Sequence, residues 1–166
     1  MPHPHRPQHL THSHHSPRVG NMSAQNLHGD QYEADFFALD FAFGSIATLV
    51  TSTLSVNVQA DSAFLWEQTT VVGNKNGEAE PWVSGRQFPF TVFLTDTGTG
   101  RQLMNVPVPL TNWAGRGDLP FILPQPRIFM PKATINMQLV SFSASTWDNV
   151  HVTLLGKKLF EYGRAS

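Results

Sequence analysis

Apolar and polar residues alternate in short stretches along this chain, and residues that form turns end each stretch. Residues 90–94 read FTVFL, so that Phe, Val and Leu at every second position are separated by Thr and Phe. A period of two places one set of side chains on one face of an extended strand. Residues 96–100 (DTGTG) favour a turn, because aspartate bonds to nearby backbone and glycine accepts a positive φ. Residues 101–106 resume the extended pattern, so the sequence predicts a strand, a turn and a second strand.

The same extended pattern recurs before and after this predicted hairpin. It is present in residues 37–43, 46–60, 63–72, 133–142 and 149–160. Glycine and asparagine in residues 73–85 predict a loop, and residues 143–149 predict a connection. No segment has the pattern of a helix longer than two turns. About seven or eight half-buried strands separated by short turns indicate an all-β protein, an antiparallel β-sandwich or jelly roll.

Prolines after the hairpin restrict how the next segment fits a sheet. They are Pro107, Pro109, Pro120, Pro124, Pro126 and Pro131. Proline has no backbone N–H to donate to a neighbouring strand, so these residues exclude central-strand positions and favour edges and crossings. Trp113 and Phe121 lie among them. An extended aromatic segment at the edge of a sandwich is suited to contact with a neighbouring subunit.

The composition limits the classes of protein to which the chain can belong. We divide the 166 residues into a flexible arm and linker, residues 1–35, and a β-sandwich domain, residues 36–166. The absence of cysteine excludes disulfides and thiolate metal sites. A formal charge of −1 gives no general attraction to nucleic acid or to anionic membranes. We find no signal peptide and no apolar run near the roughly 18 residues that span a bilayer.

Few residues are charged, and aromatic residues are abundant. Charged residues make up 14% of the chain, which also has 12 Phe and 4 Trp. Soluble domains usually have about 25% charged residues. The difference suggests that other subunits cover part of the surface, and therefore that the protein is a homo-oligomer or part of an assembly.

Histidine and proline dominate residues 1–20. The histidines of this segment are His3, His5, His9, His12, His14 and His15. Such a segment has too few apolar side chains to offset the entropic cost of ordering, so we expect a disordered arm. Scattered histidines bind Zn or Ni weakly, but nothing here fixes their geometry, and we expect no metal site and no cofactor. An arm of this kind can still become ordered on an assembly partner.

Residues 96–98 (DTG) are also the active-site triplet of aspartic proteases. Small dimeric members of that class supply one catalytic aspartate from each subunit, and residues 154–156 (LLG) match their hydrophobic-hydrophobic-glycine element. The flanking residues differ, because Thr95 stands where an apolar residue is usual and Thr99 where alanine or serine is usual. A run of turn formers followed by a strand is ordinary in a hairpin. We therefore expect no catalytic residues, with a dimeric aspartic protease using Asp96 as the alternative.

Other short motifs have simpler structural explanations. Residues 116–118 (RGD) form a cell-adhesion tripeptide, but in a loop they are explained as a turn with solvated charges. His151 falls on the polar side of its strand, and we expect a structural role for it. Exposed Trp82, Trp113 or Trp147 would be the platforms of a carbohydrate-binding module, and burial of these tryptophans would exclude that class.

Four segments together resemble small structural proteins of tailed-bacteriophage particles. They are residues 90–103 (FTVFLTDTGTGRQL), 105–110 (NVPVPL), 119–127 (LPFILPQPR) and 152–160 (VTLLGKKLF). Within that class the chain is most similar to capsid decoration (cement) proteins. Such proteins are non-enzymatic β-sandwich or jelly-roll modules that bridge major capsid subunits, often with an extended arm.

The resemblance implies a virion protein made in the bacterial host cytoplasm that binds and stabilises the exterior of the capsid shell. The implied partners are the major capsid protein and neighbouring copies of this chain. A head-tail connector, collar or tail component is the alternative within the same class. The residues that we expect to contact partners are His9, His12 and Leu27 in the arm, and Trp113, Arg116, Phe121 and Arg127 in the proline-rich segment.

Overall fold

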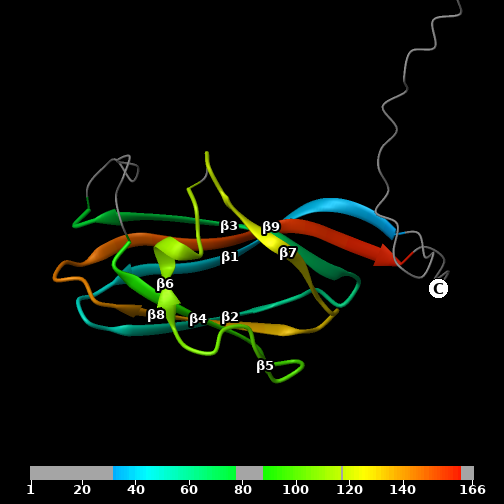
Figure 1. Ribbon diagram of the computed structural model, residues 1–166, viewed down its shortest axis with the longest axis horizontal. Helices are drawn as coiled ribbons and strands as arrows, with labels where there is room; N and C mark the ends of the chain where they lie inside the picture. Colours follow the sequence, from blue (N-terminus) through cyan, green and yellow to red (C-terminus); the bar gives the residue numbers. More distant parts are fainter. Residues whose placement is uncertain (1–31, 78–87, 117, 162–166) are drawn as a thin grey trace, which may run out of the picture.

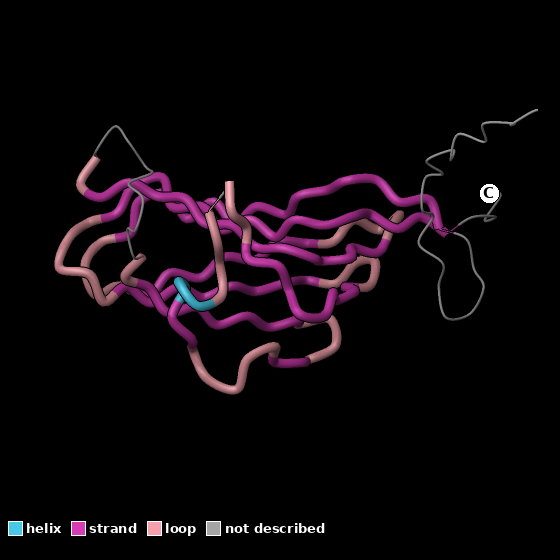
Figure 2. Tube along the Cα trace, turned by 45° about the horizontal axis from the view of Figure 1, so that its top comes forward, coloured by secondary structure: helices cyan, strands magenta, loops and turns pink. Residues whose placement is uncertain are grey.

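The computed structural model describes residues 32–77, 88–116 and 118–161, which form two antiparallel sheets packed face to face (Figure 1, Figure 2). One sheet has four strands in the order β1-β9-β3-β7. The other has five, with β2-β8-β4-β5 along one path and β6 also paired with β4. The predicted antiparallel β-sandwich is confirmed.

The four-stranded sheet consists of β1 (Tyr32–Ile46), β9 (Trp147–Glu161), β3 (Ala63–Lys75) and β7 (Phe121–Phe129). The five-stranded sheet consists of β2 (Thr51–Asn57), β8 (Thr134–Ser141), β4 (Phe90–Asp96), β5 (Arg101–Gln102) and β6 (Val108–Pro109). A 3-10 helix, η1 (Leu110–Asn112), follows β6. In the described residues, no helix has the length and apolar character needed to cross a membrane.

The core lies between the two sheets and is built from the apolar sets of the alternating strands. In β4 the side chains of Phe90, Val92 and Leu94 are buried, and the intervening side chains are partly exposed, as the period of two predicts. β8 alternates in the same way. The largest fully buried side chains include Phe41, Phe64, Phe129, Leu139 and Leu154. Burial of each such side chain contributes about 1.5–3 kcal/mol to folding.

Aromatic rings pack against one another at two places in this core. Phe64 stacks on Phe129, with ring centroids 6.4 Å apart and planes 10° apart, and Trp66 stacks on Phe129 at 6.1 Å. Near the other end, Trp147 packs against Phe88 at 5.2 Å and against Phe90 at 5.8 Å. Edge and offset arrangements of this kind are the favoured geometries of aromatic pairs.

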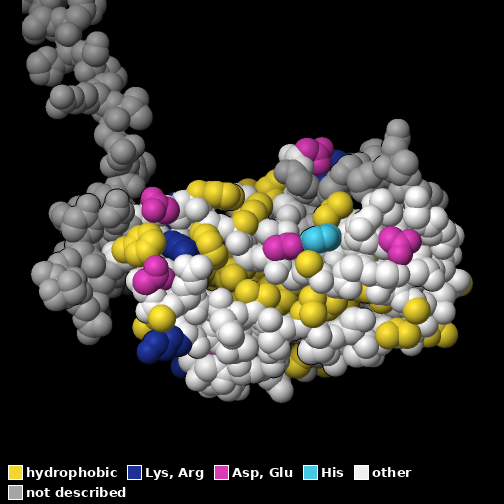
Figure 3. Space-filling view, turned by 180° about the vertical axis from the view of Figure 1, so that it is seen from behind, with side chains coloured by type: hydrophobic (Ala, Val, Ile, Leu, Met, Phe, Trp, Pro, Cys, Tyr) yellow, Lys and Arg dark blue, Asp and Glu magenta, His cyan; other side chains and the backbone are white. Residues whose placement is uncertain are grey.

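The outer faces of the two sheets differ in chemistry. Most outward side chains of β2 and β8 carry hydroxyl or amide groups, as in the hydrogen bond from Ser55 Oγ to Asn136 Oδ1 at 2.6 Å. The outer face of the four-stranded sheet instead has ion pairs such as Lys157–Glu67, with Nζ 3.3 Å from Oε1. In Figure 3 that face also shows apolar side chains, in yellow, around an adjacent histidine and acidic residue. An uncharged outer face on one sheet accounts for part of the low charge content.

Several strand bounds differ from the sequence prediction. β1 begins at Tyr32, before the predicted domain start at residue 36, because its pairing with β9 extends to Glu161. The predicted strand over residues 46–60 is split by a turn in which Leu49 has a φ of 56°. That positive φ is incompatible with a continuous strand.

Two further corrections concern the strands beside the core. β9 begins at Trp147, which we predicted to lie in a connection, because its indole is buried against Phe88 and Phe90. The predicted strand over residues 101–106 is wrong beyond Gln102. Leu103 and the residue after it turn inward and pack against the core.

Candidate binding groove beside the edge strand β7

A groove of about 780 Å³ lies between the two sheets at one edge of the sandwich. One wall is β7, the edge strand of the four-stranded sheet, and the other is the β4–β5 hairpin with the two residues after it, Leu103 and Met104. Trp66 of β3 and Trp113, which follows η1, also line it. Its volume falls within the range of about 300–1,000 Å³ that is usual for ligand pockets.

The groove exists because the middle of β7 bows away from its neighbour. Arg127 pairs with Trp66 and Ile122 pairs with Gln68, so four residues of β7, 123–126, stand opposite one residue of β3. Two of the four are Pro124 and Pro126, which have no N–H to donate. The prediction that these prolines favour an edge strand is confirmed.

The chain crosses from one sheet to the other beside the groove, and Gly115 fixes that crossing. Gly115 N donates to Thr69 O at 3.1 Å, and Val71 N donates to Gly115 O at 2.8 Å. A Cβ atom on Gly115 would lie 2.2 Å from Leu119 O. A side chain at this position is therefore excluded by the close approach of two backbone segments.

Two tryptophans form a rigid part of the groove wall. Their ring centroids are 5.4 Å apart, with planes tilted by 60°. The Nε1 of Trp66 donates to Gln68 O at 2.8 Å and to Thr69 Oγ1 at 3.1 Å, which fixes its ring. Trp113 is half-buried against it.

Asp96 lines the groove, but its carboxylate organises the hairpin turn. Oδ1 accepts hydrogen bonds from Gly98 N at 3.0 Å and from Thr99 N at 3.3 Å, and Oδ2 accepts one from Thr99 Oγ1 at 2.7 Å. The residue is 4% exposed. Both oxygens thus have partners within the turn, as the hairpin interpretation predicts.

The second element of the protease alternative lies in the other sheet. Gly156 belongs to β9, where it pairs with Phe37 and Trp66, whereas Asp96 ends β4. The geometry around Asp96 is therefore that of a turn, and the two protease-like motifs are placed on different layers of the sandwich.

Two arginines give the groove its charge. Arg101 is exposed at the start of β5, and Arg127 lies in β7 with its guanidinium carbon 5.9 Å from the centroid of the Phe129 ring. Within the residues that the structure describes, neither arginine forms an ion pair. Because the Asp96 carboxylate is engaged in its turn, both cations are available to an anionic group.

The structure brings together three of the predicted contact residues. Trp113, Phe121 and Arg127 all line the groove. Arg116 does not, and instead its Nε lies 3.5 Å from Asp118 Oδ1 in the adjacent turn, as expected for solvated charges in a loop. The predicted arm contacts His9, His12 and Leu27 lie outside the described residues.

Sequence reasoning missed Arg101, Met104, Leu123 and Met130, which also line the groove. Their closeness to prolines in the sequence is only a weak indication that they line a groove. Residues 101–104 and 123–130 meet only through the packing of the two sheets.

Exposed apolar side chains concentrate on and beside β7. In the described residues, nine large hydrophobic side chains are exposed, and four of them lie between positions 119 and 130. These four are Leu119, Ile122, Ile128 and Met130, exposed by 68, 67, 47 and 60%. We call them the β7 apolar surface. Clustered exposed apolar side chains mark interaction sites more often than single ones do.

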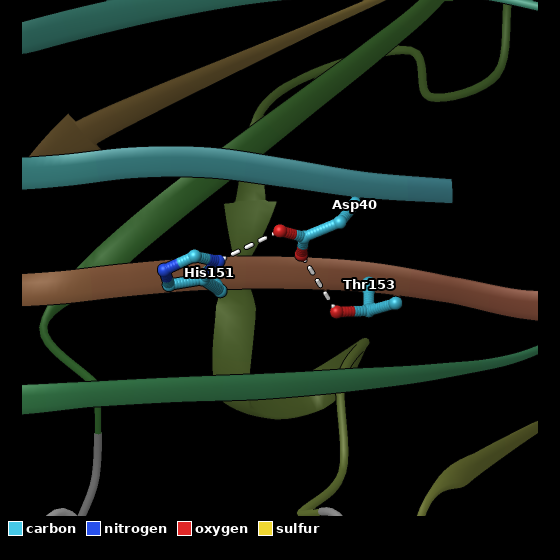
Figure 4. A network of polar contacts seen from close by, with 3 residues as sticks. All are labelled: Asp40, His151 and Thr153. Carbon is cyan, nitrogen blue, oxygen red and sulfur yellow. Dashed lines mark hydrogen bonds and ion pairs between the residues drawn. The ribbon is translucent and has the colours of Figure 1, made fainter. Parts of the chain in front are cut away.

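A polar cluster on the outer face of the four-stranded sheet contains the predicted structural histidine (Figure 4). His151 Nδ1 lies 2.7 Å from Asp40 Oδ2, and Thr153 Oγ1 donates to Asp40 Oδ1 at 2.8 Å. The hydroxyl is bonded to the carboxylate and not to the imidazole. The cluster therefore lacks the nucleophile–base contact of a catalytic triad and links β1 to β9.

The described residues also bear on two further possibilities, a metal site and a carbohydrate-binding platform. These residues contain no group of three or more side chains able to hold a metal ion. Trp147 is 2% exposed and is excluded as a carbohydrate platform, and Trp113 is half-buried. Trp82 lies outside the described residues.

Comparison of the chain with models of protein families, with curated proteins and with solved structures gave no match.

Proposed function

We propose that this chain is a non-enzymatic structural protein of a bacteriophage virion, a decoration protein that binds the capsid exterior through β7. The observation that carries the proposal is the β7 apolar surface, which adjoins a groove lined by residues expected to contact partners. The resemblance of the four sequence segments to phage structural proteins supports the same class.

Docking of the β7 apolar surface on the shell would remove four large apolar side chains from water. Each full burial contributes about 1.5–3 kcal/mol, part of which is lost to the entropy of association. Many copies on a symmetric shell multiply such weak contacts. A protein that binds the assembled lattice and not its free subunits stabilises that lattice by mass action.

The prolines of β7 shape how such a contact forms. An exposed apolar edge strand tends to pair with strands of other molecules, and proline on the edge opposes this. Pro124 and Pro126 occupy the middle of β7. Contact therefore takes place through side chains at this part of the strand, which limits uncontrolled edge-to-edge association.

The first test is the copy number of this protein relative to the major capsid protein, measured by quantitative mass spectrometry on purified particles of the virus that encodes it. Hundreds of copies support decoration of the shell. A dozen or fewer assign the protein to a connector, collar or tail. Its absence contradicts the virion proposal and favours the aspartic protease alternative, in which Asp96→Asn would abolish any peptide cleavage.

The second test locates the docking surface. Ile122→Ser and Met130→Ser should each weaken binding to particles that lack the protein by about tenfold, since each removes roughly 1.4 kcal/mol of apolar burial. Leu49→Ser is the matched control, because Leu49 is 77% exposed in the turn between β1 and β2. Co-sedimentation of the purified full chain gives the affinities. If Ile122→Ser and Met130→Ser bound as tightly as Leu49→Ser and the wild-type chain, β7 would not be the docking surface.

A further inference from the structure

The groove presents two arginines from opposite layers of the sandwich, neither of which forms an ion pair with another described residue. Arg101 comes from the five-stranded sheet and Arg127 from the four-stranded sheet, and both line the same groove. We propose that this groove holds an extended peptide segment of the partner protein, with apolar side chains and a carboxylate that the two arginines bind. The inference rests on the proposed function, because it takes the segment to come from the shell.

Charge selects the polar part of the ligand. The carboxylate of the groove, Asp96, already accepts three hydrogen bonds from its own turn. The two guanidinium groups are thus left with unused donors, and the planar fork of arginine matches a carboxylate. Arg127 is held over the ring of Phe129, which lowers the entropy lost when it binds an anion.

The apolar residues that line the groove favour a peptide over a sugar or a small anion. Leu103, Met104 and Leu123 supply flexible apolar contacts, and methionine adapts to irregular shapes. A sugar ring needs an open aromatic platform, whereas Trp113 is half-buried and tilted by 60° against Trp66. A small inorganic anion would leave these apolar walls uncovered.

The groove and the β7 apolar surface are continuous. Ile128 and Met130 belong to both, since they line the groove and are 47 and 60% exposed. A partner that covers β7 therefore also faces the groove entrance. The middle of β7 cannot donate from Pro124 or Pro126, so the segment binds through side chains instead of adding a strand there.

The test compares two arginine variants and one lysine control variant of the full chain in co-sedimentation with particles that lack the protein. Arg101→Gln and Arg127→Gln should each weaken binding about tenfold, because each removes charged hydrogen bonds. Lys158→Gln is the matched control, since Lys158 lies over the ring of Phe37 in β1 and does not line the groove, and β9 and β3 separate β1 from β7. The groove variants should also show a weaker dependence of affinity on salt.

A photo-crosslinker at Met104 then identifies the segment in assembled particles. The expected product is a peptide of the major capsid protein that contains Asp or Glu, and the same crosslinker at Leu49 should not capture it. Capture of a glycan at Met104 would overturn the peptide assignment. If the wild-type chain binds particles and both groove variants bind equally well, the peptide inference is wrong but the proposed function stands. Failure of the wild-type chain to bind particles overturns the proposed function, and the inference with it.

Discussion

The two edges of the sandwich are built differently. At one edge, β1 and β2 belong to opposite sheets and are joined by the short turn at residues 47–50, so the chain itself seals the layers. At the other edge, β7 and β5 face each other across a groove of about 780 Å³. At the sealed edge, β2 pairs with β8 without a register shift, and β1 pairs with β9 with small shifts only around Gly44, whereas β7 bows outward around its prolines.

This difference separates the residues expected to stabilise the fold from those proposed to bind a partner. The sealed edge adjoins the fully buried side chains of β1, such as Phe41. The open edge instead has half-buried or exposed leucine, methionine and arginine side chains over a tryptophan floor. Substitutions at the sealed edge should therefore unfold the protein, and substitutions at the open edge should mainly change what it binds.

The largest expected effect is at the sealed edge. Phe41→Ala removes a ring that is 0% exposed and should lower the free energy of unfolding by about 3–5 kcal/mol. Leu123→Ala, in the half-buried groove wall, should cost about 1 kcal/mol, because its site is partly open to water already. Urea denaturation followed by tryptophan fluorescence measures both. Similar losses for the two variants would show that the groove wall is part of the stabilising core.

A smaller effect is expected at the turn that forms one wall of the groove. Asp96→Ala removes the acceptor of three hydrogen bonds and should cost about 1–3 kcal/mol. Asp118→Ala is the control, since that side chain is 74% exposed and should change stability by less than about 0.5 kcal/mol. Thermal unfolding of the pair measures the difference. If Asp96→Ala were as stable as the control, the turn would not depend on its carboxylate.

The smallest effect is expected from the polar cluster that links β1 to β9. The side chains of His151 and Asp40 are 37 and 41% exposed, and exposed pairs of this kind contribute about 0.2–1 kcal/mol. His151→Gln should therefore shift the denaturation midpoint only slightly. A loss near that of Phe41→Ala would mean that surface polar contacts, and not the core, hold the sealed edge.

The parts of this molecule that sequence reasoning predicted are those determined by local pattern. The alternation of apolar and polar residues along β4 and β8 predicted which of their faces are buried, and the turn-forming residues around Gly98 predicted the hairpin. Prolines placed β7 at an edge. In each case the physical cause lies within a few residues of the signal.

The groove itself could be predicted only in part. Trp113, Phe121 and Arg127 were expected to form contacts because they lie near prolines, but the pattern did not show that Arg101 and Met104 would join them. Whether these residues come together depends on which strands of the two sheets face each other across the core. Pairing of Gly115 with β3, which brings the chain across at this point, has no local signature beyond a glycine in a loop.

Tyr32 in β1 pairs with Glu161 in β9, so the first and last described residues are neighbours in one sheet, as the blue and red ends of the ribbon in Figure 1 show. Two strands, β9 and β3, separate β1 from β7 and its groove. A short linker joining these ends would therefore close the domain into a ring, and new ends could be opened at an exposed turn. A protein joined directly at Tyr32 or Glu161 would therefore leave from β1 and β9, and β3 would lie between it and the β7 edge.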